Sequence, residues 1–446
     1  MKARHVIITV FLVATALRFA YGILVYRHVL TVSGSDFVAL WDYDAIEHVL
    51  IAKALVEGKG YVVDADADLT NKHPRLIGGP ALFKAPLYQY LLAGVFRIAG
   101  FSFALFFPFQ ALLGGALSVL VAKIAMRAFS ESTVVGLFAG LASATHPVLV
   151  NTASQPYNET VFFFLFFLSV WLFLSWLASP RWLSAVAFGV TAGLATLTRE
   201  SMVLPFATMA VLGVVYRWPQ RRNLVGGLIM VAAAVMTVAP WTLHNYRQFG
   251  VILPVSSISG TSIGIGNNEC VAAGSLFTPF DGDIACPSLN VQREALLKEM
   301  PKEPLTVWND RAYAHLGRNF IIQHPGDYLR LSFRRAWTTF LPYHPRQAFG
   351  GIKALLVILY SILVIGVGLV SMLVSIWRGQ TIEAKILVWV ALATYVPLVA
   401  IYVSADLRYR VGTDLLLACF AGWGYSVLAT HAVRRLRSNS ATLAST

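Results

Sequence analysis

Charged residues are scarce in this sequence. Only 13% of its 446 residues are Asp, Glu, Lys or Arg, whereas 57% are hydrophobic. A soluble domain averages about 25% charged residues, so the composition excludes an ordinary soluble globular protein. Several apolar runs reach the roughly 20 residues that cross a bilayer as a helix. We therefore predict an all-α polytopic membrane protein.

Acidic residues are scarcer than basic ones. The chain has 22 Asp and Glu against 35 Lys and Arg, a formal net charge of +13. Much of the positive charge lies in short loops between apolar runs, where it sets membrane orientation, so nucleic acid is not an expected partner. With both termini in the cytoplasm, the inner loops and tail hold Lys123, Arg127, Arg181, Arg217, Arg221, Arg222, Arg378, Lys385, Arg434, Arg435 and Arg437.

About ten spans (10–12) are expected. The apolar runs are residues 6–26, 103–122, 133–150, 160–178, 183–198, 202–216, 223–240, 352–376, 385–403 and 411–430. We predict an N-terminal membrane module (1–240) whose first outer loop, 27–102, carries interfacial helices. An outer-face segment with a small soluble subdomain (241–351), C-terminal membrane helices (352–430) and a disordered cytoplasmic tail (431–446) follow. The start of the chain shows no small-residue cleavage site, so the first span is interpreted as retained.

Cysteine is rare. Of three cysteines, Cys419 falls in the last span, whereas Cys270 and Cys286 share the outer-face segment. An oxidising exterior would allow these two to form a disulfide worth about 3 kcal/mol in the chain-entropy model. Two unpaired thiols are the alternative. The glycine-rich stretch 256–270 follows no Walker or dinucleotide pattern, so no nucleotide site is expected.

The few acids are unevenly placed, with eight of the 22 between Asp36 and Asp68. In "WDYDAIEHVL", a helix beginning near Asp42 would put Asp44, Glu47 and His48 on one face. Three interpretations remain open. The acids favour the positive end of a helix dipole, they bind a metal, or Asp44 is a general base for an acceptor hydroxyl. No further ligand cluster accompanies them, and we assign no metal site.

Other charged residues lie at the ends of apolar runs. Lys84 could reach a phosphate at headgroup level, or it could simply snorkel. Glu159 opens a strongly apolar helix, where it could serve a site or the helix dipole. Arg199 and Glu200 lie at a break between two predicted spans and could form a local ion pair. Three guanidiniums near the outer face suit a lipid phosphate or anionic headgroups: Arg247, Arg408 and Arg410.

Several stretches together resemble a known family. In order they are "DYDAIEHVLIAKALVEGKGY", "KAPLYQYLLAGVFRIAG", "NETVFFFLFFLSVWLF", "GLATLTRES", "APWTLHNYRQFG", "IGIGNNE" and "LRYR". Their number and order resemble bacterial GT-C glycosyltransferases of the protein O-mannosyltransferase and aminoarabinose-transferase type. The resemblance implies a GT-C fold and a polyprenyl-phosphate-linked sugar as donor.

The resemblance also implies roles for individual residues. Asp44 matches the family's acidic residue in the first loop, the expected base. The residues expected near the donor phosphate are Lys84, Arg408, Arg410 and, from its position, Arg247. Those expected near the sugar or acceptor are Asp42, Glu47, His48, Tyr88 and Glu159. His48, Ala85 and His244 depart from the family pattern, at positions where Tyr, Pro and Arg are usual.

The resulting prediction is a membrane glycosyltransferase that acts with inversion on the outer face of a bacterial plasma membrane. Its partners would be a polyprenyl-phosphate-linked sugar, membrane lipids and a hydroxyl-bearing acceptor, which could be a lipid, a glycan or a protein. No cofactor is required, and a divalent cation remains open. A transporter or flippase of lipid-linked sugars is the alternative, although internal repeats and polar broken helices, which mark many transporters, are not evident.

Overall fold

The computed structural model describes most of the chain. The described residues are 2–30, 43–65, 78–101, 103, 105–216, 221–273, 286–299, 305–340, 351–379, 381–400 and 407–443. They are almost wholly helical apart from one two-stranded sheet, in which β1 (Val62–Val63) pairs antiparallel with β2 (Gly79–Pro80). The predicted all-α class is confirmed.

The membrane module consists of long apolar helices. They are α1 (Ala3–Leu30), α5 (Phe106–Ala128), α6 (Thr133–Ala144), α7 (Pro147–Thr152), α8 (Glu159–Ala178), α9 (Trp182–Thr196), η2 (Glu200–Met202), α10 (Val203–Val215) and α11 (Arg221–Phe249). The C-terminal part adds α17 (Ile352–Tyr360), the π-helix η3 (Ser361–Gly366), α18 (Val367–Trp377), α19 (Ile382–Ala400) and α20 (Leu407–Leu443).

Ten apolar helical segments account for the predicted spans. Within the described residues, seven are long and apolar enough to cross a membrane, and three shorter apolar helices accompany them. The phenylalanine-rich α8 runs through the main core, where Phe166, Phe167 and Phe173 are fully buried. The chain is therefore a multi-pass membrane protein.

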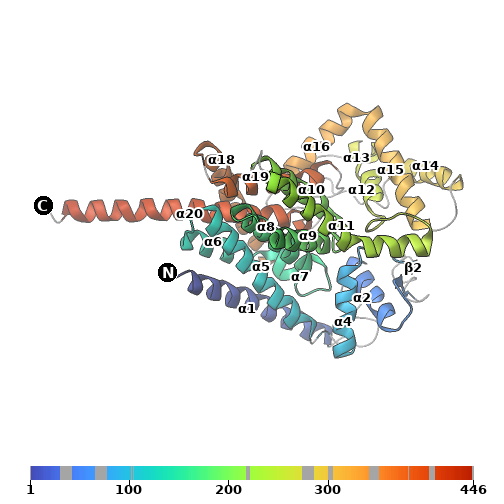
Figure 1. The fold of residues 1–446 in the computed structure, drawn as a ribbon, viewed down its shortest axis with the longest axis horizontal. Coiled ribbons are helices and arrows are strands. Elements are labelled where there is room, and N and C mark those ends of the chain that lie inside the picture. The colour runs from blue at the N-terminus through green and yellow to red at the C-terminus, as the bar shows by residue number, and fades with distance from the viewer. Residues whose placement is uncertain are drawn as a thin grey trace.

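Two outer segments complete the fold. The first carries α2 (Tyr43–Val56), the small sheet and α4 (Leu87–Ala99). The second carries α12 (Ser259–Gly266), α13 (Glu269–Ala273), α14 (Pro287–Lys298), α15 (Leu305–Gln323) and α16 (Pro325–Thr339). In Figure 1 both segments lie at the end of the molecule opposite the N and C labels, so they share one side of the membrane module.

The predicted limits of the segments differ from the helices in two places. The division at residue 240 falls inside α11, which continues past Pro240 to Phe249. The tail that we expect to be disordered from residue 431 instead continues α20 to Leu443. No Gly or Pro follows Gly424, and the stretch contains the good helix formers Ala, Leu and Arg, so propagation of the helix is favourable. The domain division otherwise stays a prediction.

Helix packing in the membrane module relies on small residues. Gly189 and Gly193 of α9 face α11 closely enough that a Cβ at position 189 would overlap the Met230 carbonyl oxygen and lie 2.7 Å from the Ala233 Cβ. Small residues of this kind let membrane helices approach each other closely.

Gly189→Ala should therefore lower stability by about 1–3 kcal/mol through overpacking. Gly94→Ala is the matched control because it also lies within a helix, α4, and its added Cβ would meet nothing within 4 Å. That control should unfold at or above the wild-type temperature, since Ala is the better helix former. Thermal unfolding of the purified proteins in detergent measures both. Equal melting temperatures for the two variants would contradict the α9–α11 packing described here.

Candidate active site

The acidic helix α2 lies against Lys84. Asp44 is in the first turn of α2 and Glu47 is three residues further, so both point to one side. The Lys84 Nζ lies 2.7 Å from Asp44 Oδ1 and 2.7 Å from Glu47 Oε2. One ammonium therefore bridges two carboxylates.

The position of Lys84 is fixed by the small sheet and by Tyr61. Ala81 N donates to the Tyr61 carbonyl, and the Tyr61 hydroxyl donates to the carbonyl oxygens of Lys84 (3.1 Å) and Ala85 (3.2 Å). This turn leads directly into α4. The backbone of Lys84 is therefore held in place by hydrogen bonds, in addition to the ion pairs that its side chain makes.

The ion pairs shift the acid–base properties of these groups. Lys84 holds the pKa of the Asp44 carboxyl far below its usual range, against the opposing effect of burial, and Arg408 adds to the shift. Burial lowers the pKa of Lys84, but Asp44 and Glu47 outweigh it, and the net pKa is above the usual value. Asp44 is therefore a carboxylate and Lys84 an ammonium at neutral pH.

His48 lies on the same face but makes different contacts. Its Nδ1 is 2.9 Å from the Gln89 Nε2, and its ring meets Tyr88 edge-on with centroids 5.0 Å apart. Burial lowers the pKa of His48 well below its ordinary value. The imidazole is thus neutral at physiological pH and is held by the adjacent helix α4.

A second set of cations reaches the same place from distant segments. Arg408, in the first turn of α20, places Nη2 3.5 Å from Asp44 Oδ2 and stacks over the Tyr157 ring at 4.8 Å. Arg199, between α9 and η2, donates from Nη1 to Glu159 Oε1 at 3.0 Å and lies over the Tyr409 ring at 5.3 Å. A pair between neighbours Arg199 and Glu200 was one expectation, but Arg199 bonds Glu159 instead.

Glu200 faces the outer-face segment. Its carboxylate accepts hydrogen bonds from the hydroxyls of Ser256 and Ser259, the latter at 2.6 Å. A backbone bond from Ser257 N to the Leu82 carbonyl oxygen at 2.8 Å ties the same stretch to the first outer loop. Both outer segments therefore close over the same region.

Many of these groups line one cavity of about 320 Å³. Its charged lining comes from Asp44, Lys84, Glu159, Arg199 and Glu200, with His48 beside them. The opposite wall, from the outer-face segment, is rich in hydroxyls: Ser256, Thr261 and Ser262. The cavity thus combines carboxylates, cations and hydroxyls on the side of the molecule that carries both outer segments.

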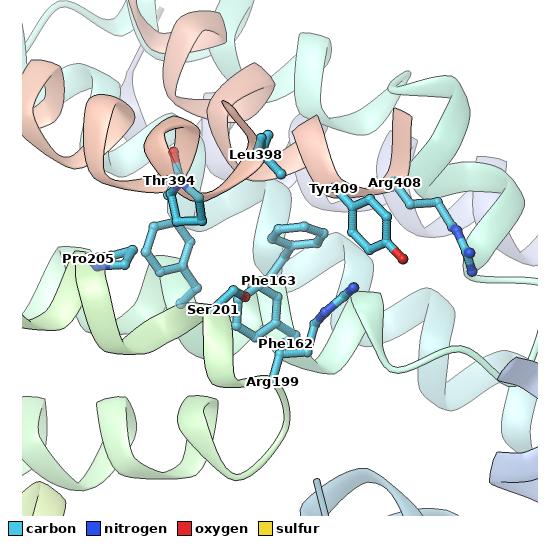
Figure 2. A pocket seen from close by; sticks show the side chains of 11 residues that line it. Phe162, Phe163, Arg199, Ser201, Pro205, Thr394, Leu398, Arg408 and Tyr409 are labelled. Atoms are coloured by element: carbon cyan, nitrogen blue, oxygen red, sulfur yellow. The ribbon is translucent and has the colours of Figure 1, made fainter. Parts of the chain in front are cut away.

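An apolar crevice between the helices adjoins this cavity. Phe162, Phe163 and Phe166 of α8 line it together with Pro397 and Leu398 of α19. Arg199, Ser201 and Tyr409 line both spaces, and Arg408 lines the crevice. Figure 2 shows the Arg199 and Tyr409 side chains pointing toward one another beside Phe163. Two guanidiniums therefore lie where an apolar space meets a polar one.

The structure does not bring every predicted residue to the cavity. Arg410 is buried, with its Nε 2.9 Å from Asp414 Oδ1 and its Nη1 donating to the Thr339 carbonyl oxygen. It lies two positions after Arg408, and residues two apart on a helix do not share a face. Its expected place at a donor phosphate is thus not supported.

Other predicted residues also lie away from the cavity. Arg247 is exposed near the end of α11 and does not line it. Tyr88 is buried behind His48. Asp42 lies outside the described residues. Cys270 and Cys286 form a disulfide in the outer-face segment, away from the cavity lining.

Some lining residues carried little signal in the sequence. The guanidinium of Arg408 lies near two tyrosine rings, that of Tyr157 at 4.8 Å and that of Tyr409 at 6.0 Å. Tyr409 stands between two arginines in "LRYR", which hinted at such a contact, whereas the serines that bind Glu200 had no distinguishing pattern. For metals, no group of three His, Cys, Asp or Glu residues in the described part of the chain could hold an ion.

Comparisons with known proteins agree with this fold. The sequence model of the family described as "Dolichyl-phosphate-mannose-protein mannosyltransferase" matches residues 83–243, a stretch that contains Lys84, Glu159 and Arg199. No curated protein matches the sequence closely enough to count as a relative. The resemblance to GT-C glycosyltransferases that the motifs indicate is confirmed by the family match together with the fold.

A solved structure shares the architecture. It is the archaeal oligosaccharyltransferase AglB from Archaeoglobus fulgidus, in complex with an inhibitory peptide and a dolichol-phosphate. The likeness has a TM-score of 0.52 at 12% identity and covers 97% of this chain and 52% of that one. This chain thus spans about half the length of AglB, and the similarity shows the GT-C fold.

The lowered pKa of Asp44 predicts a pH-dependent contribution to stability. Because the pKa is lower in the folded than in the unfolded state, the contribution is present above the unfolded value of about 4 and is lost as the pH falls below it. Asp44→Asn should lose about 1–2 kcal/mol at pH 7, a small value because the carboxylate is partly exposed and Lys84 keeps Glu47. The difference from wild type should shrink below about pH 4.

Thermal unfolding between pH 3 and pH 8 measures this difference. Asp64→Asn is the matched control, since Asp64 lies in the same outer loop and pairs with the exposed Lys59. It should change stability by less than about 1 kcal/mol. A destabilisation by Asp44→Asn that stays constant down to pH 3 would contradict the ion-pair assignment.

Proposed function

We propose that this protein is a membrane glycosyltransferase that moves a sugar from a polyprenyl-phosphate-linked donor to a hydroxyl of an acceptor. The observation that carries the proposal is the convergence of Asp44, Lys84 and Arg408 at a polar cavity that adjoins an apolar crevice. A lipid-linked sugar has the same division, with an apolar chain on one side of a phosphate and a polar sugar on the other.

The donor would lie across the boundary between the two spaces. Its polyprenyl chain would enter between α8 and α19, along Phe162, Phe163 and Leu398. Its phosphate would then meet Arg199 and Arg408, because guanidiniums bind phosphate oxygens in a bidentate fashion. Lys84, 2.7 Å from Asp44, is close enough to share that phosphate.

The chemical step would be direct displacement with inversion. The acceptor oxygen attacks the anomeric carbon while the bond from this carbon to the phosphate oxygen breaks. The acceptor's proton passes to the Asp44 carboxylate, and the phosphate leaves on the polyprenol with its negative charge stabilised by Lys84 and Arg408. The carboxylate thus acts on the attacking oxygen and the cations on the leaving phosphate.

Donor binding would also activate the base. Before the donor binds, Lys84 and Arg408 neutralise Asp44 and make it a weak base. A phosphate that takes up their hydrogen bonds removes this stabilisation of the charged form, so the pKa of Asp44 rises. Asp44 then becomes basic only when a leaving group is in place.

Glu47, His48 and Glu159 would contact the sugar or the acceptor. Glu159 and His48 line the cavity, and Glu47 is linked to it through Lys84. The Glu159 Oε1 accepts a hydrogen bond from Arg199, and its Oε2 is buried. Asp42 keeps this predicted role, whereas buried Tyr88 would act by holding the His48 ring.

The site would face the outside of a bacterial plasma membrane. The basic residues of the short loops favour an orientation with both termini in the cytoplasm. Both outer segments lie at the end of the molecule away from the termini (Figure 1), and residues of both segments line the cavity. The acceptor would be a lipid, a glycan or a protein, and the reaction as written uses no cofactor.

Asp44→Asn should reduce transfer about 10²–10⁴-fold, since it removes the proton acceptor without changing the shape of the side chain. The assay is transfer of labelled sugar from a panel of polyprenyl-phosphate sugars by the purified protein in lipid. Asp64→Asn, in the same loop but away from the cavity, should retain wild-type rates. Full activity of a folded Asp44→Asn protein would remove Asp44 from the mechanism, and movement of donors across the bilayer without transfer would favour a flippase.

Leu398→Trp should fill the apolar crevice and raise the KM for a long-chain donor about tenfold, with a smaller change for a short-chain donor. A tenfold change corresponds to about 1.4 kcal/mol, which is within the range for one misfitted apolar group. Leu392→Trp is the control because Leu392 lies on the same helix, is exposed and does not line the crevice. An equal effect of both substitutions, or no effect of Leu398→Trp, would place the polyprenyl chain elsewhere.

A further inference from the structure

A second polar cavity lies in the outer-face segment. Its volume is about 170 Å³, and it is enclosed by the start of α13, by α14 and by the C-terminal half of α15. Five of its eleven lining residues carry carboxamides, namely Asn267, Asn268, Gln292, Asn319 and Gln323. None of the proposed catalytic residues lines it.

Helix α12 separates this cavity from the proposed active site. Thr261, Ser262 and Ile265 of α12 line the catalytic cavity, whereas Asn267 and Asn268, directly after the helix, line the second one. The two spaces are thus neighbours on either side of one short helix, and both belong to the same side of the membrane module.

The floor of the second cavity is rigid. The Asn267 side chain donates to the Ile263 carbonyl oxygen and accepts from Arg335 Nη1 at 3.1 Å. The Asn268 Oδ1 accepts from the Val271 backbone N–H, also at 3.1 Å. The Cys270–Cys286 disulfide joins the two sides of the cavity next to these contacts. A ligand would therefore meet a preformed surface, which reduces the entropy lost on binding.

The remaining lining residues are suited to a polyhydroxylated molecule. Gln292 and Gln323 are exposed, and Asn319 is partly so. Each carboxamide both donates and accepts hydrogen bonds, as a sugar hydroxyl does. Phe320 and His324 stack with ring centroids 5.3 Å apart, which adds a flat apolar wall for the C–H face of a sugar ring.

The charges of the lining exclude other classes of ligand. No Lys or Arg lines this cavity, although the chain has 35 of them, so a phosphate or another anion would find no strong partner. The one carboxylate, Glu269, already accepts a hydrogen bond from Ser288 at 2.5 Å. A purely apolar ligand would cover the exposed carboxamides of Gln292 and Gln323 without offering them a hydrogen bond.

We propose that this cavity binds one neutral saccharide unit. The cavity lies beyond α12 from the catalytic cavity, so the saccharide would be a sugar residue of the acceptor, held while a neighbouring hydroxyl reacts. This link to the acceptor rests on the proposed function, whereas the binding itself does not. The acceptor would then be a glycan or a glycosylated molecule.

Binding of a panel of methyl hexopyranosides to the purified full-length protein tests the proposal. Saturation-transfer NMR would detect weak binding, with a Kd on the order of 10 mM for a single sugar unit. Asn319→Ala and Gln323→Ala should each weaken binding about tenfold, because each loses a side chain that both donates and accepts. Gln248→Ala, an exposed carboxamide near the end of α11, should bind as wild type does.

Asp44→Asn separates this inference from the proposed reaction. It should abolish transfer and leave saccharide binding unchanged, because Asp44 lies in the other cavity. If no sugar of the panel binds at concentrations up to about 50 mM, the proposal is wrong. It is also wrong if binding survives Asn319→Ala and Gln323→Ala but is lost with Asp44→Asn, since the sugar would then occupy the catalytic cavity. Unchanged melting temperatures exclude unfolding as the cause of a loss.

Discussion

The contact on which the site depends is the bridge from Lys84 to Asp44 and Glu47, with Arg408 on the far oxygen of Asp44. It joins the first outer loop to the start of the last helix, 364 residues further along the chain. Lys84 and Arg408 favour the charged form of Asp44, and the two carboxylates favour the charged form of Lys84. The pairing of these charges therefore holds the first outer loop and the start of α20 together beside the cavity.

Aromatic contacts explain how the charged groups of the site can lie next to the apolar membrane helices. The guanidinium groups of Arg199 and Arg408 lie over aromatic rings. The ring of Phe162 is 5.8 Å and that of Tyr409 5.3 Å from the Arg199 Cζ, and the ring of Tyr157 is 4.8 Å from the Arg408 Cζ. Cation–π contacts of this kind stabilise a guanidinium that has lost some of its water. The two guanidiniums can thus lie at the edge of the apolar crevice, which is where the charged headgroup of a lipid would join its apolar chain.

Much of this arrangement follows from residue patterns. Apolar runs were sufficient to predict the ten helical segments, and the three- and four-residue spacing of Asp44, Glu47 and His48 predicted their common face. Patterns do not show which partner each group takes. Arg410 turns into a buried network because it lies two positions from Arg408, and Arg199 bonds Glu159 and not its neighbour Glu200. The serines bound to Glu200 were unpredictable, since only tertiary folding brings residues 256–259 to residue 200.

Assembly of the cavity from separate parts of the chain affects how relatives can be judged. The stretch that matches the mannosyltransferase family, residues 83–243, contains Lys84, Glu159 and Arg199 but neither Asp44 nor Arg408. Two homologous chains could match over this stretch equally well while only one kept a carboxylate in the first loop and a guanidinium at the start of the last helix. A match over residues 83–243 therefore does not show whether a relative has the residues that correspond to Asp44 and Arg408.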